Sequence, residues 1–382
     1  LVLLILKRSL LAILVKINIL VLTMKVCIIL GTRPEIIKLS SIIRYLKDGK
    51  KSFFIIHSNQ HYSENMDAIF FKELNLPKPK YNLNVGSGSH GVQTAKMMEK
   101  IESILLKEKP STVIVQGDTN TVLAGALVAS KMQIPVSHVE AGLRSYDRTM
   151  PEELNRIMTD HISEFLFVPT SDQKETLQGE AIDKNKVFVV GNTVVDAVKE
   201  NSKIAEKVKT LEQNKLHRFE YFLLTMHRPS NVDDKTVLKR ILSALEKVSK
   251  QYGLKIVFPI HPRTANQIKL FKIKVPKGIM IIEPVGYLEF LKLQKYAKLI
   301  ITDSGGIQEE ACALKTPCVT IRENTERPET VAVGGNTLAG TSEAKIINSV
   351  KKMIGKKKNW KNPYGNGKTG EKIIKILERK LK

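Results

Sequence analysis

Short apolar runs alternate with longer stretches of mixed polarity along the chain from Met24 onward. Runs of four or five apolar, often β-branched residues predict buried strands, whereas the longer stretches have the spacing of amphipathic helices. The strands predicted in the first half are Val26–Leu30, Phe53–His57, Val113–Gln116, Val136–Val139, Phe165–Val168 and Val187–Val190. The helices predicted between them include Ile36–Leu46, Gln93–Lys107, Thr121–Met132 and Pro151–Ile162. This βαβ order predicts a parallel, doubly wound sheet.

The alternation restarts after Gly191-Asn192-Thr193, which has the composition of a turn. A mostly polar helix is predicted over Val194–Lys215. The later strands are predicted at Tyr221–Thr225, Lys255–Pro259, Ile279–Ile282, Lys298–Thr302 and Cys318–Ile321. We therefore predict an α/β fold with two Rossmann-like domains, residues 24–190 and 191–361, and a C-terminal helical segment, 362–382, that packs back on the first domain.

The first 23 residues form an apolar extension that is interrupted by Lys7, Arg8, Lys16 and Asn18. Its longest uninterrupted run is too short for a membrane span, and no small-residue cleavage site follows it. Met24 stands directly before the first predicted strand. We therefore predict that translation naturally begins at Met24 and that residues 1–23 are an over-extended reading frame or a dispensable appendage. The alternative is a membrane anchor.

Composition narrows the class of protein. With 382 residues, 42% of them hydrophobic and 26% charged, the chain has the profile of a globular enzyme of two domains. The net charge of +23 raises the possibility of a nucleic-acid partner, but the lysines are scattered and cluster densely only at Lys351, Lys352 and Lys356–Lys358. Since no recognition helix, zinc motif or aromatic ladder accompanies them, a positive field that attracts an anionic substrate is the simpler interpretation. The cysteines (Cys27, Cys312 and Cys318) lack CxxC spacing and are predicted to be reduced core residues of a cytoplasmic protein.

The stretch Leu299–Glu310, with the sequence L-I-I-T-D-S-G-G-I-Q-E-E, predicts a strand, a glycine turn and a helix. Asp303 and Ser304 are predicted to cap the helix, and Gly305-Gly306 removes side-chain bulk where the chain turns. A helix N-terminus offers unpaired N–H groups and the positive end of its dipole to a phosphate. Glu310, one turn later, is placed to accept hydrogen bonds from a ribose. The alternative is a βα turn with small residues for packing alone.

In a doubly wound sheet, ligands bind beyond the carboxyl ends of the strands. The first strand is followed by Gly31-Thr32-Arg33-Pro34-Glu35 rather than by G-x-G-x-x-G, so nicotinamide chemistry is not supported. Arg33 and Lys38 are candidate phosphate ligands, with solvated surface charges as the alternative.

Three acidic positions follow later strands or begin a helix: Asp118, Glu140 and the pair Glu152-Glu153. Carboxylates that converge on one cleft suit proton transfer, because burial and mutual repulsion raise a pKa into a useful range. Taken singly, each is equally well a helix cap or salt-bridge residue. Thr159-Asp160-His161 is predicted to be structural.

The second half places histidine and arginine after its strands. His227 and Arg228 follow one strand, and His261 and Arg263 follow the next, where they are candidates for diphosphate binding or proton transfer. The alternative is that they bond to loop carbonyls. The charged loop Arg322–Glu329, which includes Arg327, is a candidate for gripping a nucleotide or sugar.

Together these motifs resemble the non-hydrolysing UDP-N-acetylglucosamine 2-epimerases. The resemblance runs from about Met24 to about Gly340 and rests on G-T-R-P-E-I-I-K, Q-G-D-T-N-T-V, H-V-E-A-G-L-R, M-P-E-E-L-N-R, G-N-T-V-V-D, T-M-H-R-P-S-N, H-P-R and D-S-G-G-I-Q-E-E. It implies a glycosyltransferase-B-like fold, with two Rossmann-like domains facing across a cleft, in a cytoplasmic homodimer of nucleotide-sugar metabolism and polysaccharide biosynthesis. It implies reversible conversion of UDP-N-acetylglucosamine to UDP-N-acetylmannosamine, by elimination of UDP and its re-addition to a 2-acetamidoglucal intermediate, without a metal or other cofactor. We expect neither a nucleic-acid partner nor a stable membrane association.

The resemblance also implies roles for single residues. It gives catalytic roles to Asp118, Glu140, Glu152 and His227. Further residues are predicted to bind substrate, either because the resemblance implies it or because they follow a predicted strand: Arg33, Lys38, Arg144, Arg228, His261, Arg263, Ser304, Gly305, Gly306, Glu310 and Arg327.

Two departures from the family pattern bear on regulation and substrate. The Q-H-x-x-M element of members activated by their own substrate is longer here, at Gln60–Met66, so this regulation is not expected. The segment between Arg144 and Pro151 is short, as in relatives that act on UDP-linked diacetamido-uronic sugars. A 2-epimerase of UDP-2,3-diacetamido-glucuronate is therefore one alternative, and a retaining glycosyltransferase of the same fold is another. A basic protein that binds nucleic acid or a membrane surface is the third.

Overall fold

The computed structural model describes residues 24–59 and 70–381. The predictions for residues 1–23 and for the Gln60–Met66 element lie outside the described residues. The chain divides into two compact units, one that extends to Thr193 and resumes at Lys368, and one that comprises Val194–Gly367. Among the described residues, no helix combines the length and the apolar character needed to cross a membrane.

The first unit contains a parallel sheet in the order β3-β2-β1-β4-β5-β6-β7. Its strands are β1 (Val26–Leu30), β2 (Phe53–His57), β3 (Tyr81–Asn82), β4 (Thr112–Gln116), β5 (Val136–Val139), β6 (Phe165–Val168) and β7 (Val187–Val189). Its helices are α2 (Arg33–Asp48), α4 (His90–Glu108), α5 (Asn120–Lys131), α6 (Pro151–Ile162), α7 (Ser171–Gly179) and α17 (Thr369–Lys380).

The second unit repeats this arrangement with a parallel sheet in the order β10-β9-β8-β11-β12-β13. Its strands are β8 (Tyr221–Thr225), β9 (Lys255–Pro259), β10 (Ile279–Ile282), β11 (Leu299–Thr302), β12 (Cys318–Thr320) and β13 (Asn336–Leu338). Its helices are α8 (Thr193–Ala205), α9 (Thr210–Gln213), α10 (Pro229–Val232), α11 (Lys235–Tyr252), α12 (Pro262–Leu270), α13 (Tyr287–Tyr296), α14 (Gly305–Leu314), α15 (Pro328–Ala332) and α16 (Glu343–Ile354).

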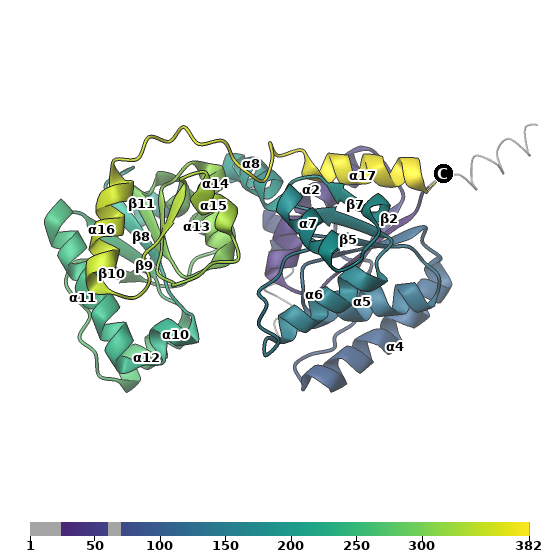
Figure 1. Cartoon of the computed structure of the whole chain (residues 1–382), viewed down its shortest axis with the longest axis horizontal. Helices are drawn as coiled ribbons and strands as arrows, with labels where there is room; N and C mark the ends of the chain where they lie inside the picture. The colour runs from purple at the N-terminus through teal and green to yellow at the C-terminus, as the bar shows by residue number, and fades with distance from the viewer. Residues whose placement is uncertain (1–23, 60–69, 382) are drawn as a thin grey trace, which may run out of the picture. The chain divides into compact units, whose positions relative to one another are not determined.

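Alternation along the strands builds a core on each face of the second sheet. Phe222 and Leu224 of β8 pack in a cluster with residues of α11 and α16, two helices that lie side by side in Figure 1. Tyr221 and Leu223 point to the opposite face and pack with residues of α13 and α14. Helices on both faces of a parallel sheet confirm the predicted α/β class.

The C-terminal helix α17 lies along α2 in the first unit (Figure 1). The two backbones approach closely at Gly370, where a Cβ atom would lie 2.8 Å from Ser41 Oγ and 3.0 Å from the Ile42 nitrogen. Any larger residue at this position would force the helices apart, so Gly370 permits the contact.

The prediction of one helix over Val194–Lys215 is wrong. Helix α8 ends at Ala205, and the chain then turns before the short helix α9. The buried Lys292 side chain of α13 donates hydrogen bonds to the carbonyl oxygens of Glu206 and Val208. Because these carbonyls bond a lysine rather than later helical N–H groups, the helix does not continue.

Each sheet has one point at which the strand order reverses. In the first unit this switch point lies between β1 and β4, and in the second it lies between β8 and β11. The loops that leave neighbouring strands diverge there, which leaves room for a ligand beyond the carboxyl ends.

Candidate active site

Gly31 and Glu35 form the turn after β1. A Cβ atom on Gly31 would lie 2.1 Å from Ser58 Oγ and 2.4 Å from Thr121 Oγ1, so no larger residue fits there. The buried carboxylate of Glu35 accepts hydrogen bonds from the backbone N–H groups of Gly31 and Thr32 and, at 2.6 Å, from the Thr119 hydroxyl. It thereby joins the β1–α2 turn to the β4–α5 turn. Burial raises the pKa of Glu35 to about 7, although these three hydrogen bonds act in the opposite direction.

Lys38 and Glu140 form an ion pair at the same edge. The Lys38 ammonium lies 2.8 and 2.6 Å from the two carboxylate oxygens of Glu140, and the Gln116 amide also donates to that carboxylate. Glu140 directly follows β5 and has a positive φ of 68°, an unusual backbone conformation for a glutamate. The structure thus brings together two of the residues that the sequence predicts. Arg33, at the start of α2, lies with its guanidinium 5.1 Å from the centre of the Phe70 ring.

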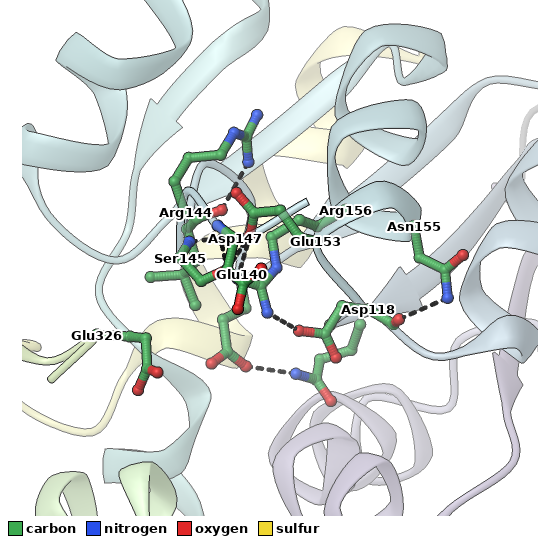
Figure 2. Close-up of polar contacts among 12 residues, drawn as sticks. Asp118, Glu140, Arg144, Ser145, Asp147, Glu153, Asn155, Arg156 and Glu326 are labelled. Carbon is green, nitrogen blue, oxygen red and sulfur yellow. Dashed lines mark hydrogen bonds and ion pairs between the residues drawn. The ribbon is translucent and has the colours of Figure 1, made fainter. Parts of the chain in front are cut away.

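Asp118 follows β4 and is held at both its side chain and its backbone. Its carboxylate pairs with Arg156, and its carbonyl oxygen accepts a hydrogen bond of 3.0 Å from the Asn155 amide (Figure 2). Both partners project from the first turns of α6. Neither Arg156 nor Asn155 was predicted as a site residue, although both lie within the M-P-E-E-L-N-R motif.

Glu152 and Glu153 have different environments at the start of α6. Glu152 is exposed, whereas Glu153 is buried and accepts hydrogen bonds from the Ser145 backbone and hydroxyl, both 2.9 Å, and from the Tyr146 backbone at 3.0 Å. Burial opposes ionisation of Glu153, but these hydrogen bonds and the charge of Arg156 outweigh it and lower its pKa. Glu153 therefore holds the segment before α6 in place (Figure 2).

Arg144 is engaged by carboxylates within its own unit. Its guanidinium makes two hydrogen bonds of 2.7 Å to Glu180, just after α7, and one of 2.7 Å to Asp160 on α6. The side chain is only 2% exposed. These contacts give Arg144 a cross-linking role, and its contact with substrate stays a prediction.

Asp303 organises the switch point of the second unit. One of its carboxylate oxygens accepts hydrogen bonds of 2.9 Å from the backbone N–H groups of both His227 and Arg228, and the other lies 3.1 Å from His227 Nδ1. The predicted capping of α14 by the Asp303 and Ser304 side chains is wrong, since Asp303 instead caps the turn after β8 and the Ser304 side chain makes no capping hydrogen bond. Burial opposes ionisation of the Asp303 carboxylate. Its hydrogen bonds and its charge interaction with His227 have the larger effect, so the pKa of Asp303 is lowered.

The N-terminus of α14 is open at its two glycines. A Cβ atom on Gly306 would meet no heavy atom of the described chain within 4 Å, and one on Gly305 would meet only Glu326 Oε2, at 3.7 Å. Packing within the described residues therefore does not require glycine here. The small residues leave the first N–H groups of the helix accessible to an anion.

His261 and Arg263 begin α12 beside this turn. The His261 ring lies 5.3 Å from the His227 ring, centre to centre, and burial together with the neighbouring His227 lowers its pKa. His261 Nδ1 accepts a hydrogen bond from the Arg263 backbone, whereas the Arg263 side chain pairs with Asp233 at the surface. The His261 ring thus lies beside the His227 ring, whereas the Arg263 side chain points to Asp233.

Arginines pair with glutamates on α14 and in the segment that leads into α15. Arg322 makes hydrogen bonds of 2.8 and 2.7 Å to Glu326, which also lies 3.8 Å from the Arg228 guanidinium. Burial and the neighbouring Arg322 charge lower the pKa of Arg228. The remaining pairs join Arg327 to Glu309 and Gln294 to Glu310. Arg228, Arg322 and Arg327 thus bring three guanidinium groups, which can donate hydrogen bonds to a diphosphate, close to carboxylates that also pair with them.

Comparison with known proteins identifies relatives along nearly the whole chain. Residues 45–378 match the family described as UDP-N-acetylglucosamine 2-epimerase. The UDP-N-acetylglucosamine 2-epimerase of Methanocaldococcus jannaschii is 62% identical over 93% of this chain and 99% of its own. The UDP-2,3-diacetamido-2,3-dideoxy-D-glucuronate 2-epimerase of Pseudomonas aeruginosa is 38% identical over 93% of this chain and 100% of its own.

A solved structure extends the likeness to the fold. The M. jannaschii UDP-GlcNAc 2-epimerase, in complex with UDP-GlcNAc and UDP, matches with a TM-score of 0.84 and 61% identity over 93% of this chain and 100% of its own. This match confirms the predicted fold class, in which two Rossmann-like domains follow one another along the chain.

Proposed function

The chain belongs to the UDP-N-acetylglucosamine 2-epimerase family and is an isomerase, and on that premise we propose that it interconverts UDP-N-acetylglucosamine and UDP-N-acetylmannosamine. The observation that carries the proposal is the pairing of Asp118 and Glu140 with fixed cations at the first switch point. These are the carboxylates that the family resemblance assigns to proton transfer, and each has a defined position and a charged neighbour. The 62% identity with the M. jannaschii enzyme supports the acetamido-sugar as substrate.

The second unit is assigned to the nucleotide. The accessible N-terminus of α14 and the arginines Arg228, Arg322 and Arg327 suit the diphosphate, and His227 and His261 adjoin the same turn. Glu310 is assigned to the ribose hydroxyls. A firm grip on UDP is needed because the proposed reaction releases it as an intermediate.

The reaction proceeds by elimination because the hydrogen on sugar C2 is not acidic. A base removes this proton as the bond between C1 and the UDP oxygen breaks, and the electron pair of the C–H bond forms the C1–C2 double bond of 2-acetamidoglucal. UDP leaves with the bonding electrons of the C1–O bond. Re-addition of UDP to C1 and delivery of a proton to the opposite face of C2 complete the inversion.

Proton transfer is assigned to the first unit, with Asp118 and Glu140 as the principal groups and Glu152 as the third. The ammonium of Lys38 and the guanidinium of Arg156 hold these two carboxylates in position. Arg33 and Lys38 add positive charge for the departing phosphate.

Hydrogen exchange in deuterated water tests this function. The purified protein is incubated with UDP-N-acetylglucosamine, and we expect UDP-N-acetylmannosamine with deuterium at C2. Asp118→Asn and Glu140→Gln should each lower kcat by about a hundredfold or more while UDP binds as before, and Glu152→Gln tests the third carboxylate. Accumulation of the isomer without deuterium, or near-normal kcat in both principal variants, would refute the assignment.

The same experiment separates the alternative functions. Exchange that occurs only with UDP-2,3-diacetamido-glucuronate would identify the P. aeruginosa enzyme as the closer functional relative. Transfer of the sugar to an added acceptor without exchange at C2 would instead indicate a glycosyltransferase. The homodimer is proposed from the family resemblance, and sedimentation of the active protein tests it.

A further inference from the structure

His138 lies in the middle of β5 and is completely buried. Both nitrogens of its ring have a hydrogen-bond partner. Nδ1 lies 2.7 Å from Asp160 Oδ1, and Nε2 lies 2.8 Å from the carbonyl oxygen of Gly117. Neither contact belongs to the acid–base assignment of the proposed function.

The chemistry of these partners determines where the ring protons lie. A carbonyl oxygen only accepts, so Nε2 carries a proton that it donates to Gly117. The other oxygen of Asp160 accepts hydrogen bonds from Arg144 Nη1 at 2.7 Å and from the Gly142 backbone at 3.2 Å. Burial acts against ionisation of Asp160, but the charges and hydrogen bonds of His138 and Arg144 outweigh it and lower its pKa. Asp160 is therefore a carboxylate and an acceptor, so Nδ1 also carries a proton.

A buried cation needs compensation, and the surrounding groups supply it. Asp160 lies between the His138 ring and the Arg144 guanidinium, and Arg144 is shared with Glu180. Glu180 also lies 3.5 Å from Nε2 of His161. With His138 protonated, two cations face two carboxylates within this cluster, so the desolvation cost of each charge is offset by its neighbours.

The ring also holds the turn that carries Asp118. Gly117 has a positive φ of 85°, and its N–H donates to the carbonyl oxygen of Val139 at 3.1 Å. Since its own carbonyl accepts from His138, both backbone polar groups of Gly117 are tied to β5. A neutral imidazole supplies only one of the two donors and would turn a lone pair toward either an oxygen of Asp160 or that of Gly117.

We infer that His138 is a buried imidazolium that positions Asp118 for proton transfer. It is a positioning residue, because its contacts are to the Gly117 peptide and Asp160 rather than to substrate. This inference rests on the proposed function for its kinetic consequence, whereas the protonation of the ring is measurable in the resting protein. The two are therefore tested separately.

The first experiment is nitrogen NMR on the full chain labelled with ¹⁵N-histidine. At pH 7, one histidine is expected to show both ring nitrogens in the protonated range, and this signal should be absent from His138→Gln. Asp160→Asn removes the carboxylate that holds the second proton, so its spectrum should show His138 as a neutral tautomer. A neutral His138 ring in the wild-type protein would overturn the inference, whatever the enzyme does.

The second experiment compares kcat for C2 exchange with the affinity for UDP. His138→Gln is expected to lower kcat about a hundredfold, as misplaced catalytic groups do, and to leave the dissociation constant of UDP unchanged within about twofold. The matched control is His217→Gln, which replaces an exposed histidine of the second unit and should change neither quantity. Unchanged kcat in folded His138→Gln would overturn the positioning role. Absence of C2 exchange in the wild type would refute the proposed function, while the NMR result would still decide the protonation of His138.

Discussion

Glu35 provides the sharpest test of the electrostatics at the first switch point. Its carboxylate is buried, and burial raises its pKa from 4.5 to about 7. In the unfolded chain the group titrates at its ordinary value, so between these two pH values the folded protein holds a proton that the unfolded chain has released. The unfolded state then binds fewer protons, and stability falls as the pH rises through this window.

The size of the effect follows from the two pKa values. The interval from 4.5 to about 7 corresponds to about 3 kcal/mol of stability that is present at low pH and lost above pH 7. Glu35→Gln does not ionise, yet its amide oxygen still accepts from Gly31 and Thr32, and the Thr119 hydroxyl is free to accept from its amide nitrogen. We therefore expect the stability of Glu35→Gln relative to the wild type to grow by roughly 2–3 kcal/mol between pH 5 and pH 8.

Urea denaturation followed by far-ultraviolet circular dichroism at several pH values measures this difference. Glu99→Gln is the matched control, because it removes an exposed carboxylate of α4 and should leave the pH dependence unchanged. The chain's single tryptophan, Trp360, lies in the second unit and reports that unit by its fluorescence. If Glu35→Gln and the wild type keep a constant difference from pH 5 to pH 8, the raised pKa is refuted.

Three further substitutions test the second unit. Asp303→Asn removes the negative partner of His227 and turns an amide toward backbone donors, so we expect UDP to bind about tenfold more weakly by calorimetry; an unchanged dissociation constant would contradict this. Gly306→Ala should change stability by less than about 1 kcal/mol, since its methyl group meets no described heavy atom, but should weaken UDP binding about tenfold or more; equal affinity would remove the phosphate assignment. Tyr364→Phe removes a buried hydroxyl that donates to Glu329 at 3.0 Å, and should cost about 1–2 kcal/mol in tryptophan-monitored denaturation; no loss would contradict it.

The strands were the most predictable part of the fold. β1, β2, β5, β6, β8, β9 and β10 have the bounds that the apolar runs predict. Such runs are continuous because both faces of a parallel sheet are covered by helices. The edge strands β3 and β13 were not predicted, since Tyr81–Asn82 and Asn336–Leu338 contain no apolar run. Their pairing depends on the neighbouring strand already being in place.

The candidate site was predictable in position but not in its contacts. Asp118, Glu140 and His227 lie within two residues of the ends of their strands, and the rule that ligands bind beyond the carboxyl ends finds such residues without knowledge of side chains. Their partners are 38, 102 and 76 residues away in the chain, at Arg156, Lys38 and Asp303. A sequence pattern carries no signal for contacts of this separation. The hydrogen bond from the Thr32 backbone to Glu35 is an exception, because threonine followed three residues later by glutamate is a local capping signature.

The two switch points have the same topology but different sets of side chains. Around the first, Glu35, Asp118, Glu140 and Glu153 outnumber the cations Lys38 and Arg156 that pair with them. Around the second, three arginines and two histidines lie near an accessible helix N-terminus, together with the carboxylates of Asp303, Glu309 and Glu326. An elimination needs both environments, because the leaving diphosphate must be stabilised as an anion while a carboxylate takes the C2 proton. Since both sheets have the same kind of switch point, the proposed division of roles, nucleotide to the second unit and proton transfer to the first, rests on the side chains after the strands rather than on the fold.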